Sequence, residues 1–217
     1  MKSVLLIGMG QFGQLLGEKL LGMGNEVMIV DKEEDIVNTI ASKYTGALIC
    51  NCMIEDNLKA LDIPSYDACV VTIADDFQSS LEITSILKDL GAKYIVSKAN
   101  TDIQRKFLLR VGADEVIYPN RDIAEKLAVK LNSDKIYDYI ELDSVYSIFE
   151  IALPEKWIGK SIRQVNPRAK HQINILTIKK NNQYMPAPTP DTVFEKDDKI
   201  VVFGNTEQIL MFTNKQK

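Results

Sequence analysis

The sequence has few of the residues on which enzymes, metal sites and membrane proteins usually depend. Its 217 residues include one histidine, three cysteines and one tryptophan. No apolar run approaches the roughly 18 residues that a membrane-spanning helix needs. The first apolar run, residues 4–7, stops at Gly8 and is too short for the apolar region of a signal peptide. We therefore expect a cytoplasmic protein that folds in water.

Basic residues are also too few for a typical nucleic-acid binder. Lysine and arginine total 26 against 30 aspartates and glutamates, so the net charge is −4 at pH 7. Nucleic-acid-binding domains usually carry a basic surplus. With 46% apolar residues and ordinary numbers of glycine and proline, the chain has the composition of a globular protein with a real core. We expect no nucleic-acid partner.

The three cysteines, Cys50, Cys52 and Cys69, do not form a recognisable metal or disulfide pattern. Three cysteines cannot all pair with one another. Cys50 and Cys52 offer two metal ligands, but the single histidine, His171, is distant and no second cysteine pair completes a tetrahedral zinc site. We interpret all three as small buried apolar residues and expect no metal site.

Residues 1–135 alternate between short apolar runs and segments of helical length. The runs are mostly β-branched and lack polar alternation, as expected for strands buried on both faces. Such alternation predicts a parallel sheet with right-handed crossovers and helices on both faces. The predicted strands are 4–7, 26–30, 47–50, 68–74, 94–97 and 115–118, and the predicted helices are 11–21, 33–43, 55–61, 76–90, 101–111 and 122–131.

The pattern changes at about residue 136. Strands are predicted at 147–153, 174–180 and 199–203, and short helices at 161–165 and 207–212. A proline-rich loop at 185–190 cannot belong to a central strand. We therefore predict an α/β protein of two domains: a doubly wound parallel sheet over 1–135 and a smaller α+β domain over 136–217.

A glycine-rich turn follows the first predicted strand directly. Gly8 permits a tight turn, Gly10 lets a pyrophosphate approach the backbone, and Gly13 packs the helix on the strand. The free N–H groups of the following helix favour phosphate binding. The second strand ends at Asp31, where a carboxylate accepts hydrogen bonds from ribose hydroxyls and repels a 2′-phosphate. The sequence thus predicts a Rossmann-like site for NAD(H) or an adenine nucleotide rather than NADP.

No catalytic set accompanies this turn. A dehydrogenase needs a proton donor or acceptor near the reacting carbon. His171 lies in the second domain without a matching nucleophile, and Asp75 and Asp76 precede a helix that either can cap. We predict no catalytic residue and no enzyme activity, with an NAD-dependent oxidoreductase or an NADH-sensing regulator as the alternatives. A transcription regulator is disfavoured by the negative charge and by the lack of a basic helix-turn-helix.

Several further motifs carry a resemblance to a known family. The motifs are the glycine turn, Asp31, and segments 51–55, 73–76, 97–100 and 112–119 in the first half, with 159–162, 166–170, 173–175 and 198–204 in the second. In the order and spacing of these motifs, the chain resembles the RCK (regulator of K⁺ conductance) N-terminal and C-terminal domains of the Trk/Ktr potassium-uptake regulators, and among these the single-copy Ktr regulators.

The resemblance implies how such a protein works. Family members form a cytosolic ring, typically eight subunits built from dimers, beneath a separate integral-membrane potassium-translocating subunit. Nucleotide bound in the N-terminal domain changes the hinge angle of each dimer, and the ring then opens or closes the pore. The helix at 122–131 would pack between dimer partners, although burial in its own domain would give the same apolar face. The protein would thus lie at the inner face of the membrane through its partner.

The resemblance also assigns a first ligand site. The glycines would contact phosphate, Asp31 the adenosine ribose, and the segment Asn51 to Met53 the adenine. Ile73 to Asp75 and Lys98 would border the ribose and phosphates, with a solvated surface lysine as the alternative for Lys98. The full predicted set is Gly8, Met9, Gly10, Gln11, Phe12, Gly13, Asp31, Lys32, Asn51, Cys52, Met53, Ile73, Ala74, Asp75 and Lys98.

Two departures from the family pattern bear on the choice of nucleotide. Many Ktr regulators have arginine where this chain has Gln11, and glutamate where it has Asn120. A neutral glutamine offsets the charge of a triphosphate less well than arginine does. The departures favour NAD(H), with ATP and ADP retained as candidates, and they weaken the case for activation by a divalent cation.

A second ligand site, for cyclic di-AMP, is implied in the C-terminal domain. In the Ktr regulators this two-fold-symmetric ligand lies across the interface between two C-terminal domains, where each half meets the same residues. In the alternative interpretation Arg168 and Lys170 are solvated and Ile173 and Ile175 belong to the strand core. Position 167 is proline rather than the isoleucine common in the family. The predicted residues are Val165, Arg168, Ala169, Asn174, Ile175 and Pro188.

Overall fold

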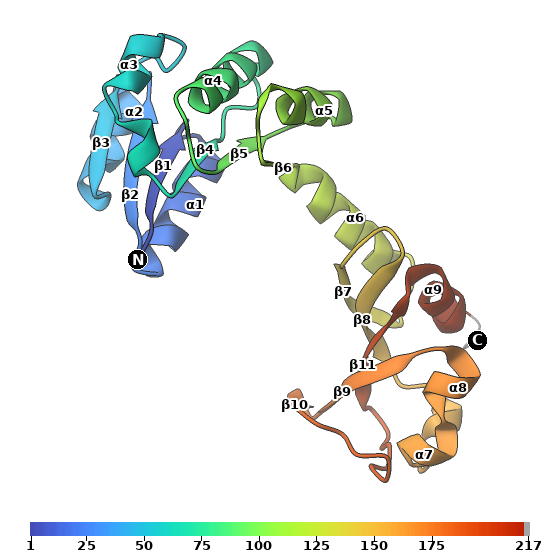
Figure 1. Cartoon of the computed structure of the whole chain (residues 1–217). Coiled ribbons are helices and arrows are strands. Elements are labelled where there is room, and N and C mark those ends of the chain that lie inside the picture. The colour runs from blue at the N-terminus through green and yellow to red at the C-terminus, as the bar shows by residue number, and fades with distance from the viewer. Residues whose placement is uncertain (215–217) are drawn as a thin grey trace. The chain divides into compact units, whose positions relative to one another are not determined.

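The computed structural model describes residues 1–214, and the chain divides into two compact units, Met1–Arg121 and Asp122–Lys217 (Figure 1). The boundary predicted at residue 135 assigns the whole of helix α6 (Pro119–Leu131) to the first domain. The contacts instead divide the chain near the start of this helix. The reason is that Val129 packs against the core of the second unit and Lys126 forms an ion pair with Asp138 at 3.0 Å.

The first unit contains a six-stranded sheet in the order β3-β2-β1-β4-β5-β6, and every adjacent pair of strands is parallel. The predicted doubly wound parallel fold is confirmed, and the order of the strands reverses between β1 and β4. The strands are β1 (Ser3–Ile7), β2 (Glu26–Asp31), β3 (Gly46–Ile49), β4 (Ala68–Val71), β5 (Ile95–Lys98) and β6 (Glu115–Ile117).

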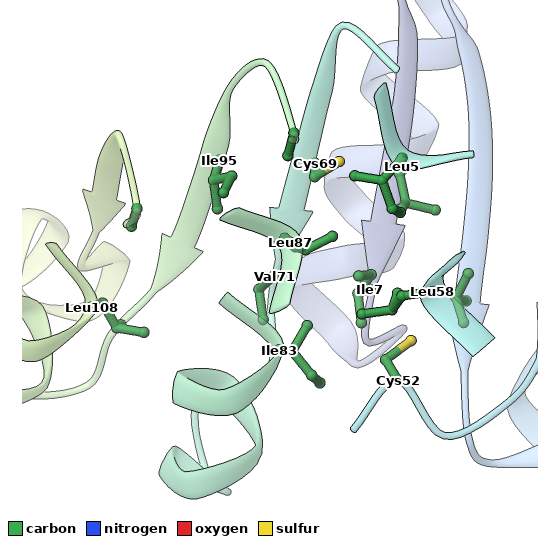
Figure 2. Close-up of a cluster of buried hydrophobic side chains, with 14 of the residues drawn as sticks. Leu5, Ile7, Cys52, Leu58, Cys69, Val71, Ile83, Leu87, Ile95 and Leu108 are labelled. Atoms are coloured by element: carbon green, nitrogen blue, oxygen red, sulfur yellow. The ribbon is translucent and has the colours of Figure 1, made fainter. Parts of the chain in front are cut away.

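Strand β1 shows why this sheet is buried on both faces. Successive side chains of a strand point to opposite faces, so a strand covered on both sides must be apolar throughout. Leu5 and Ile7 enter one core cluster, in which Figure 2 shows Leu5 near Cys69 and Ile7 near Leu58, whereas Val4 and Leu6 enter a second cluster with Val27. The sheet therefore holds its carboxyl-terminal loops on a rigid platform.

Helices connect these strands at nearly the predicted positions. They are α1 (Gln11–Gly22), α2 (Glu34–Ile40), α3 (Glu55–Lys59), α4 (Phe77–Asp89) and α5 (Asp102–Val111), with short 3-10 turns at Ala41–Lys43 and Ile63–Ser65. Local chemistry sets the ends of α5: the Thr101 hydroxyl accepts a hydrogen bond from Gln104 N, and Gly112 takes the left-handed conformation at the other end.

The second unit is built on an antiparallel sheet in the order β10-β9-β11-β8-β7. Its core includes Phe149, Ile151, Ile200, Val202 and Trp157, all of which are buried. The elements are β7 (Ile136–Glu141), β8 (Tyr146–Ala152), η3 (Glu155–Trp157), α7 (Ile162–Val165), α8 (Pro167–His171), β9 (Asn174–Lys180), β10 (Gln183–Met185), β11 (Lys199–Asn205) and α9 (Thr206–Asn214). Strands β7 and β10 and helix α8 are absent from the sequence prediction.

Among residues 1–214, none of the helices has both the length and the apolar character that crossing a membrane requires.

Candidate functional site

The glycine turn after β1 is shaped by close backbone packing. Gly8 has a φ of +95°, and its N–H donates to the Val30 carbonyl at 2.9 Å. A Cβ on Gly13 would lie 2.3 Å from the Gly8 carbonyl oxygen, so only glycine fits there. Gly10 differs, because nothing lies within 4 Å of the position of its Cβ. The open side at Gly10, the N-cap of α1, is where an anion can reach the free N–H groups of the helix.

Asp31, at the carboxyl end of β2, is bonded to this turn. One carboxylate oxygen accepts the Met9 N–H at 2.5 Å, and the other accepts the Glu33 N–H at 3.0 Å. The carboxylate thus lies beside the glycine turn. Remaining lone pairs on the two oxygens can accept hydroxyl hydrogens, and the negative charge opposes a phosphate at the same place.

A cavity opens at the carboxyl ends of the central strands, beside Gly8 and Asp31. Its wall contains seven residues of the predicted set: Gly8, Asp31, Lys32, Asn51, Cys52, Met53 and Ile73. Six further lining residues were not predicted as site residues: Ile7, Val30, Cys50, Asp76, Ser79 and Ile83. In open parallel sheets ligands bind at the carboxyl ends of the strands, next to the point where strand order reverses. The residues that end each strand carried the signal by which Cys50 and Asp76 could have been found.

Asp76 and Ser79 form the part of the wall that belongs to α4. The Asp76 carboxylate accepts the Ser79 N–H at 3.1 Å and the Ser79 hydroxyl at 2.6 Å. These bonds hold the pKa of Asp76 below its ordinary value, so the carboxylate stays ionised near neutral pH. The capping role considered for this residue is confirmed. Asp75 instead accepts a hydrogen bond from the Asn100 side chain at 3.1 Å.

The other predicted residues lie around the cavity rather than on its wall. Met9 and Ala74 are buried, and Gln11 is the first residue of α1. Lys98 ends β5, and its Nζ lies 5.7 Å from the centre of the Phe12 ring. This contact places the lysine ammonium near the start of α1. Gly10, Gly13 and Asp75 complete this outer group.

Two of the three cysteines are buried apolar residues, as predicted. Cys69 lies in the core, and burial raises the pKa of its thiol to about 12. Cys52 is also buried, and burial raises the pKa of its thiol strongly. Cys50 is only half-buried and lines the cavity, so it is not simply a core residue.

The residues predicted for a second ligand occupy one continuous stretch and one loop. Val165 ends α7, Arg168 and Ala169 lie in α8, and Asn174 and Ile175 begin β9. Pro188 belongs to the proline-rich loop, which reaches α7 because Arg163 N–H donates to the Pro190 carbonyl at 2.8 Å.

His171 has a structural environment, as expected. Its ring lies 5.0 Å from that of Phe212 and 5.9 Å from that of Trp157. Burial, with Lys156 and Lys170 nearby, lowers the pKa of His171. Packing among aromatic rings explains this residue without catalysis.

A doubly wound sheet with a glycine turn, an acidic end to the second strand and a cavity between them defines a nucleotide-binding protein of the Rossmann type. The TrkA-N domain model matches residues 4–119, and the TrkA-C domain model matches residues 146–217. The chain therefore belongs to the family of TrkA-domain proteins that includes the Ktr potassium uptake proteins.

Individual relatives agree with this placement. The Ktr system potassium uptake protein A of Bacillus subtilis (strain 168) is 35% identical over 213 residues, which is 98% of this chain and 96% of that protein. Protein C of the same system and strain is 34% identical over 211 residues, with 97% and 96% covered. The solved GsuK channel bound to NAD has the same fold, with a TM-score of 0.68 at 15% identity. That match covers 98% of this chain, which spans 39% of the GsuK chain.

Proposed function

We propose that this protein is the nucleotide-binding regulatory subunit of a Ktr-type potassium uptake system. The observation that supports it best is the cavity beside Gly8 and Asp31, in a chain 35% identical over almost its full length to a Ktr potassium uptake protein. Within residues 1–214, the groups around this cavity form no set suited to a chemical step, which supports ligand binding as its role. The proposed protein is therefore a sensor and not an enzyme.

Nucleotide binding acts by shifting the conformation of an oligomer. A ligand moves an equilibrium only as far as its affinities for the two states differ. In a ring, each subunit contributes its own small preference, and the preferences add across the assembly. The proposed assembly is a homo-oligomer built from dimers, up to an octameric ring, on the inner face of the membrane. Its partner is an integral-membrane potassium-translocating subunit.

The charges around the site favour NAD(H) over ATP. Asp31, Asp75 and Asp76 are acidic, and Lys32 and Lys98 are basic, so this set is net negative by one charge. Gln11, at the first position of α1, adds no positive charge. Unfavourable charge interactions grow with the charge of the ligand. NAD(H), with two phosphate charges, and then ADP are the preferred ligands, and ATP is the weaker candidate.

Titration calorimetry and flux measurements test this function together. The full-length chain should bind NAD or NADH with saturable heat and should not bind NADP comparably. Added to vesicles that hold its membrane partner, it should make potassium flux depend on the nucleotide. Absence of binding by any adenine nucleotide, or flux that is indifferent to the bound nucleotide, would overturn the proposal.

A second site, for cyclic di-AMP, is proposed in the C-terminal unit. Arg168 and Asn174 flank the turn between α8 and β9, and Pro188 lies in the loop tied to α7. A guanidinium can bond a phosphodiester, and an amide can hydrogen-bond a neighbouring base. Ile175 is half-buried and is proposed to supply apolar surface for the adenine, whereas Val165 is buried in the core of this unit.

A further inference from the structure

Thr72 is a buried polar residue beside the glycine turn and lies outside the predicted set of site residues. It follows β4 directly, next to β1, where the order of the strands reverses. The residue is only 8% exposed, and its N–H donates to the Ile7 carbonyl at 2.9 Å. A hydroxyl buried at such a place is costly unless it has a hydrogen-bond partner of its own.

The partner of the Thr72 hydroxyl is the carbonyl group of Gly8. The hydroxyl donates to the Gly8 oxygen, and the Ile7 oxygen lies 3.2 Å from it. A hydroxyl has only one hydrogen to donate. The Ile7 carbonyl already accepts the Thr72 N–H, so the Gly8 carbonyl is the one that depends on the hydroxyl. Because Gly8 is buried, loss of this donor would be unfavourable for the glycine turn.

The peptide unit between Gly8 and Met9 connects this hydrogen bond to Asp31. The carbonyl and the N–H of a trans peptide unit point in opposite directions. The Gly8 carbonyl points toward Thr72 and toward Gly13, on which a Cβ would lie 2.3 Å from the oxygen. At the other edge of the same unit, the Met9 N–H donates to the Asp31 carboxylate at 2.5 Å. Rotation of this one peptide unit would therefore disturb both bonds together.

We propose that Thr72 is a positioning residue for the nucleotide site. Its hydroxyl fixes the Gly8–Met9 peptide unit and, through that unit, the Asp31 carboxylate. The cavity wall includes Ile73 but not Thr72, so Thr72 acts through the turn rather than on the ligand. The inference rests on the proposed function, because it takes Asp31 to be the carboxylate that meets the ribose.

The two bonds to Asp31 explain how the loss of one would weaken binding. The Met9 N–H holds one carboxylate oxygen, and the Glu33 N–H holds the other at 3.0 Å. Without the Met9 bond the carboxylate is held through a single oxygen and can rotate. A ligand must then order this group when it binds, and that ordering reduces the affinity.

Calorimetry of the full-length chain with NAD tests the effect on binding. Thr72→Val keeps the size of the side chain and removes the donor, and it should weaken NAD binding by about fivefold, as expected for one hydrogen bond between uncharged groups. Thr72→Ala removes the same donor without risk of overpacking and should have a similar effect. Thr72→Ser keeps the hydroxyl and should bind NAD like the wild type. Unchanged affinity in both the valine and the alanine variants would overturn the proposal.

Thr84→Val is the matched control for the loss of a buried hydroxyl. Thr84 is fully buried in the same unit, and its hydroxyl donates to the Ser80 carbonyl at 2.7 Å, away from the glycine turn. This variant should lower the stability to urea and leave the affinity for NAD unchanged. A loss of NAD affinity equal to that of Thr72→Val would show a general effect of buried hydroxyls and would overturn the specific role of Thr72.

A double-mutant cycle separates positioning from a general weakening of the fold. If Thr72 acts through Asp31, Thr72→Val in the Asp31→Ala background should change the NAD affinity by less than about twofold, because no carboxylate remains to be positioned. The full loss repeated in that background would show that Thr72 does not act through Asp31, and would overturn the proposal.

Selective ¹⁵N labelling of methionine reports on the peptide unit without any ligand. The chain has seven methionines, and a Met9→Leu variant identifies the Met9 amide signal. That signal should move in Thr72→Val and in Asp31→Ala, and it should keep its position in Thr84→Val. An unmoved signal in Thr72→Val would overturn the connection through the peptide unit.

The two measurements separate this inference from the function on which it rests. If the wild-type protein binds NAD and both Thr72→Val and Thr72→Ala bind it equally well, the sensor function stands and the positioning role fails. If the wild-type protein binds no adenine nucleotide, the sensor function fails and the role of Thr72 in binding fails with it. The Met9 signal still decides whether the Thr72 hydroxyl orients the turn.

Discussion

Asp31 joins two parts of the site through a single carboxylate. Its bonds to Met9 N–H and Glu33 N–H fix it beside the glycine turn, where it faces the expected position of a ribose. Asp31→Ala should weaken NAD binding by about 1–3 kcal/mol, the range for loss of a charged hydrogen-bond partner. Calorimetry measures this. Glu33→Ala is the matched control and should bind like the wild type, because Glu33 contributes only its N–H. Equal affinities for all three proteins would contradict the role of Asp31.

Gly13 and Gly22 stand at opposite ends of α1 and should respond differently to the same substitution. A Cβ on Gly13 would meet the Gly8 carbonyl at 2.3 Å, whereas nothing lies within 4 Å of one on Gly22. Gly13→Ala should lower the free energy of unfolding by about 1–3 kcal/mol through overpacking. Gly22→Ala should leave it unchanged or slightly higher, since alanine favours helix. Urea unfolding measures the free energy of unfolding of both variants. Similar values for the two would show that the turn can rearrange to accept a Cβ at Gly13.

At the scale of elements, His171 helps to tie α8 to α9 through the rings of Trp157 and Phe212. Its pKa is lowered in the folded chain by burial and by Lys156 and Lys170. Below the unfolded pKa of about 6.5, the unfolded chain binds the proton more readily, so stability falls as pH falls through this value toward the lower folded pKa. Above it, both states are neutral and the stability is fully present.

The fluorescence of Trp157, the chain's single tryptophan, follows the unfolding of this cluster directly. The urea midpoint should fall between about pH 7 and pH 5, and His171→Phe should reduce that dependence because its ring cannot titrate. If the two proteins had parallel pH profiles, other groups would be responsible for the wild-type dependence.

Arg168 tests the second proposed ligand site, at the junction of α8 and β9. Titration of the full-length chain with cyclic di-AMP should give saturable binding, which Arg168→Ala should weaken by about 1.5–3 kcal/mol, as for a hydrogen bond to a charged group. Lys170→Ala, on the same short helix, removes one positive charge and should have a smaller effect. Equal losses of cyclic di-AMP affinity in both variants would indicate nonspecific charge attraction. Absence of binding heat from the wild-type protein would contradict the proposed site.

Elements differ in how far the sequence determined them. The first domain was predictable because buried parallel strands such as β1 are continuous apolar runs, and the glycine turn has a fixed spacing. Strand β7 was missed because its sequence, from Ile136 to Glu141, mixes apolar and acidic residues, and pairing with β8 is what makes it a strand. Helix α8 begins at Pro167 after Asn166, which adopts a left-handed φ of 50°, a pattern that also reads as a loop.

The site shows the same division between local and distant information. Gly8 and Asp31 were predictable from the residues themselves, because the glycine turn follows the first strand and Asp31 ends the second. The segment from Asn51 to Met53 was assigned by the family resemblance. The part played by Ser79 was not predictable, since the cavity wall depends on how the end of β3 and the first turn of α4 meet in space. Contacts between side chains of distant segments leave no fixed interval in the sequence by which they could be recognised.

At the scale of the whole molecule, we predict that the protein self-associates through helix α6. Every residue of α6 is at least partly exposed, and Ile123, Leu127 and Leu131 are 67%, 52% and 77% exposed. Their spacing of four residues puts them on one helical face. Exposure of such an apolar face to water is unfavourable, so we expect another subunit to cover it. Light scattering should therefore give the mass of two or more subunits of 24.4 kDa each.

Substitutions on α6 decide whether this face makes the assembly. The double variant Ile123→Asp, Leu127→Asp should lower the measured mass at least by half, because two buried carboxylates per subunit oppose association. Met23→Asp, at a site 76% exposed on the other unit, is the control and should keep the wild-type mass. A monomeric wild-type protein at micromolar concentration would exclude the ring altogether.

The strand order has a consequence for how the chain is made on the ribosome. β1 emerges first but lies in the middle of the sheet, between β2 and β4. About 60 residues separate Ile7 from β4, which at typical synthesis rates of 5–20 residues per second takes about 3–12 s. During that interval one edge of β1, among the most apolar strands in the chain, has no partner. Nascent chains should therefore engage holding chaperones until the segment that contains Val71 has left the exit tunnel.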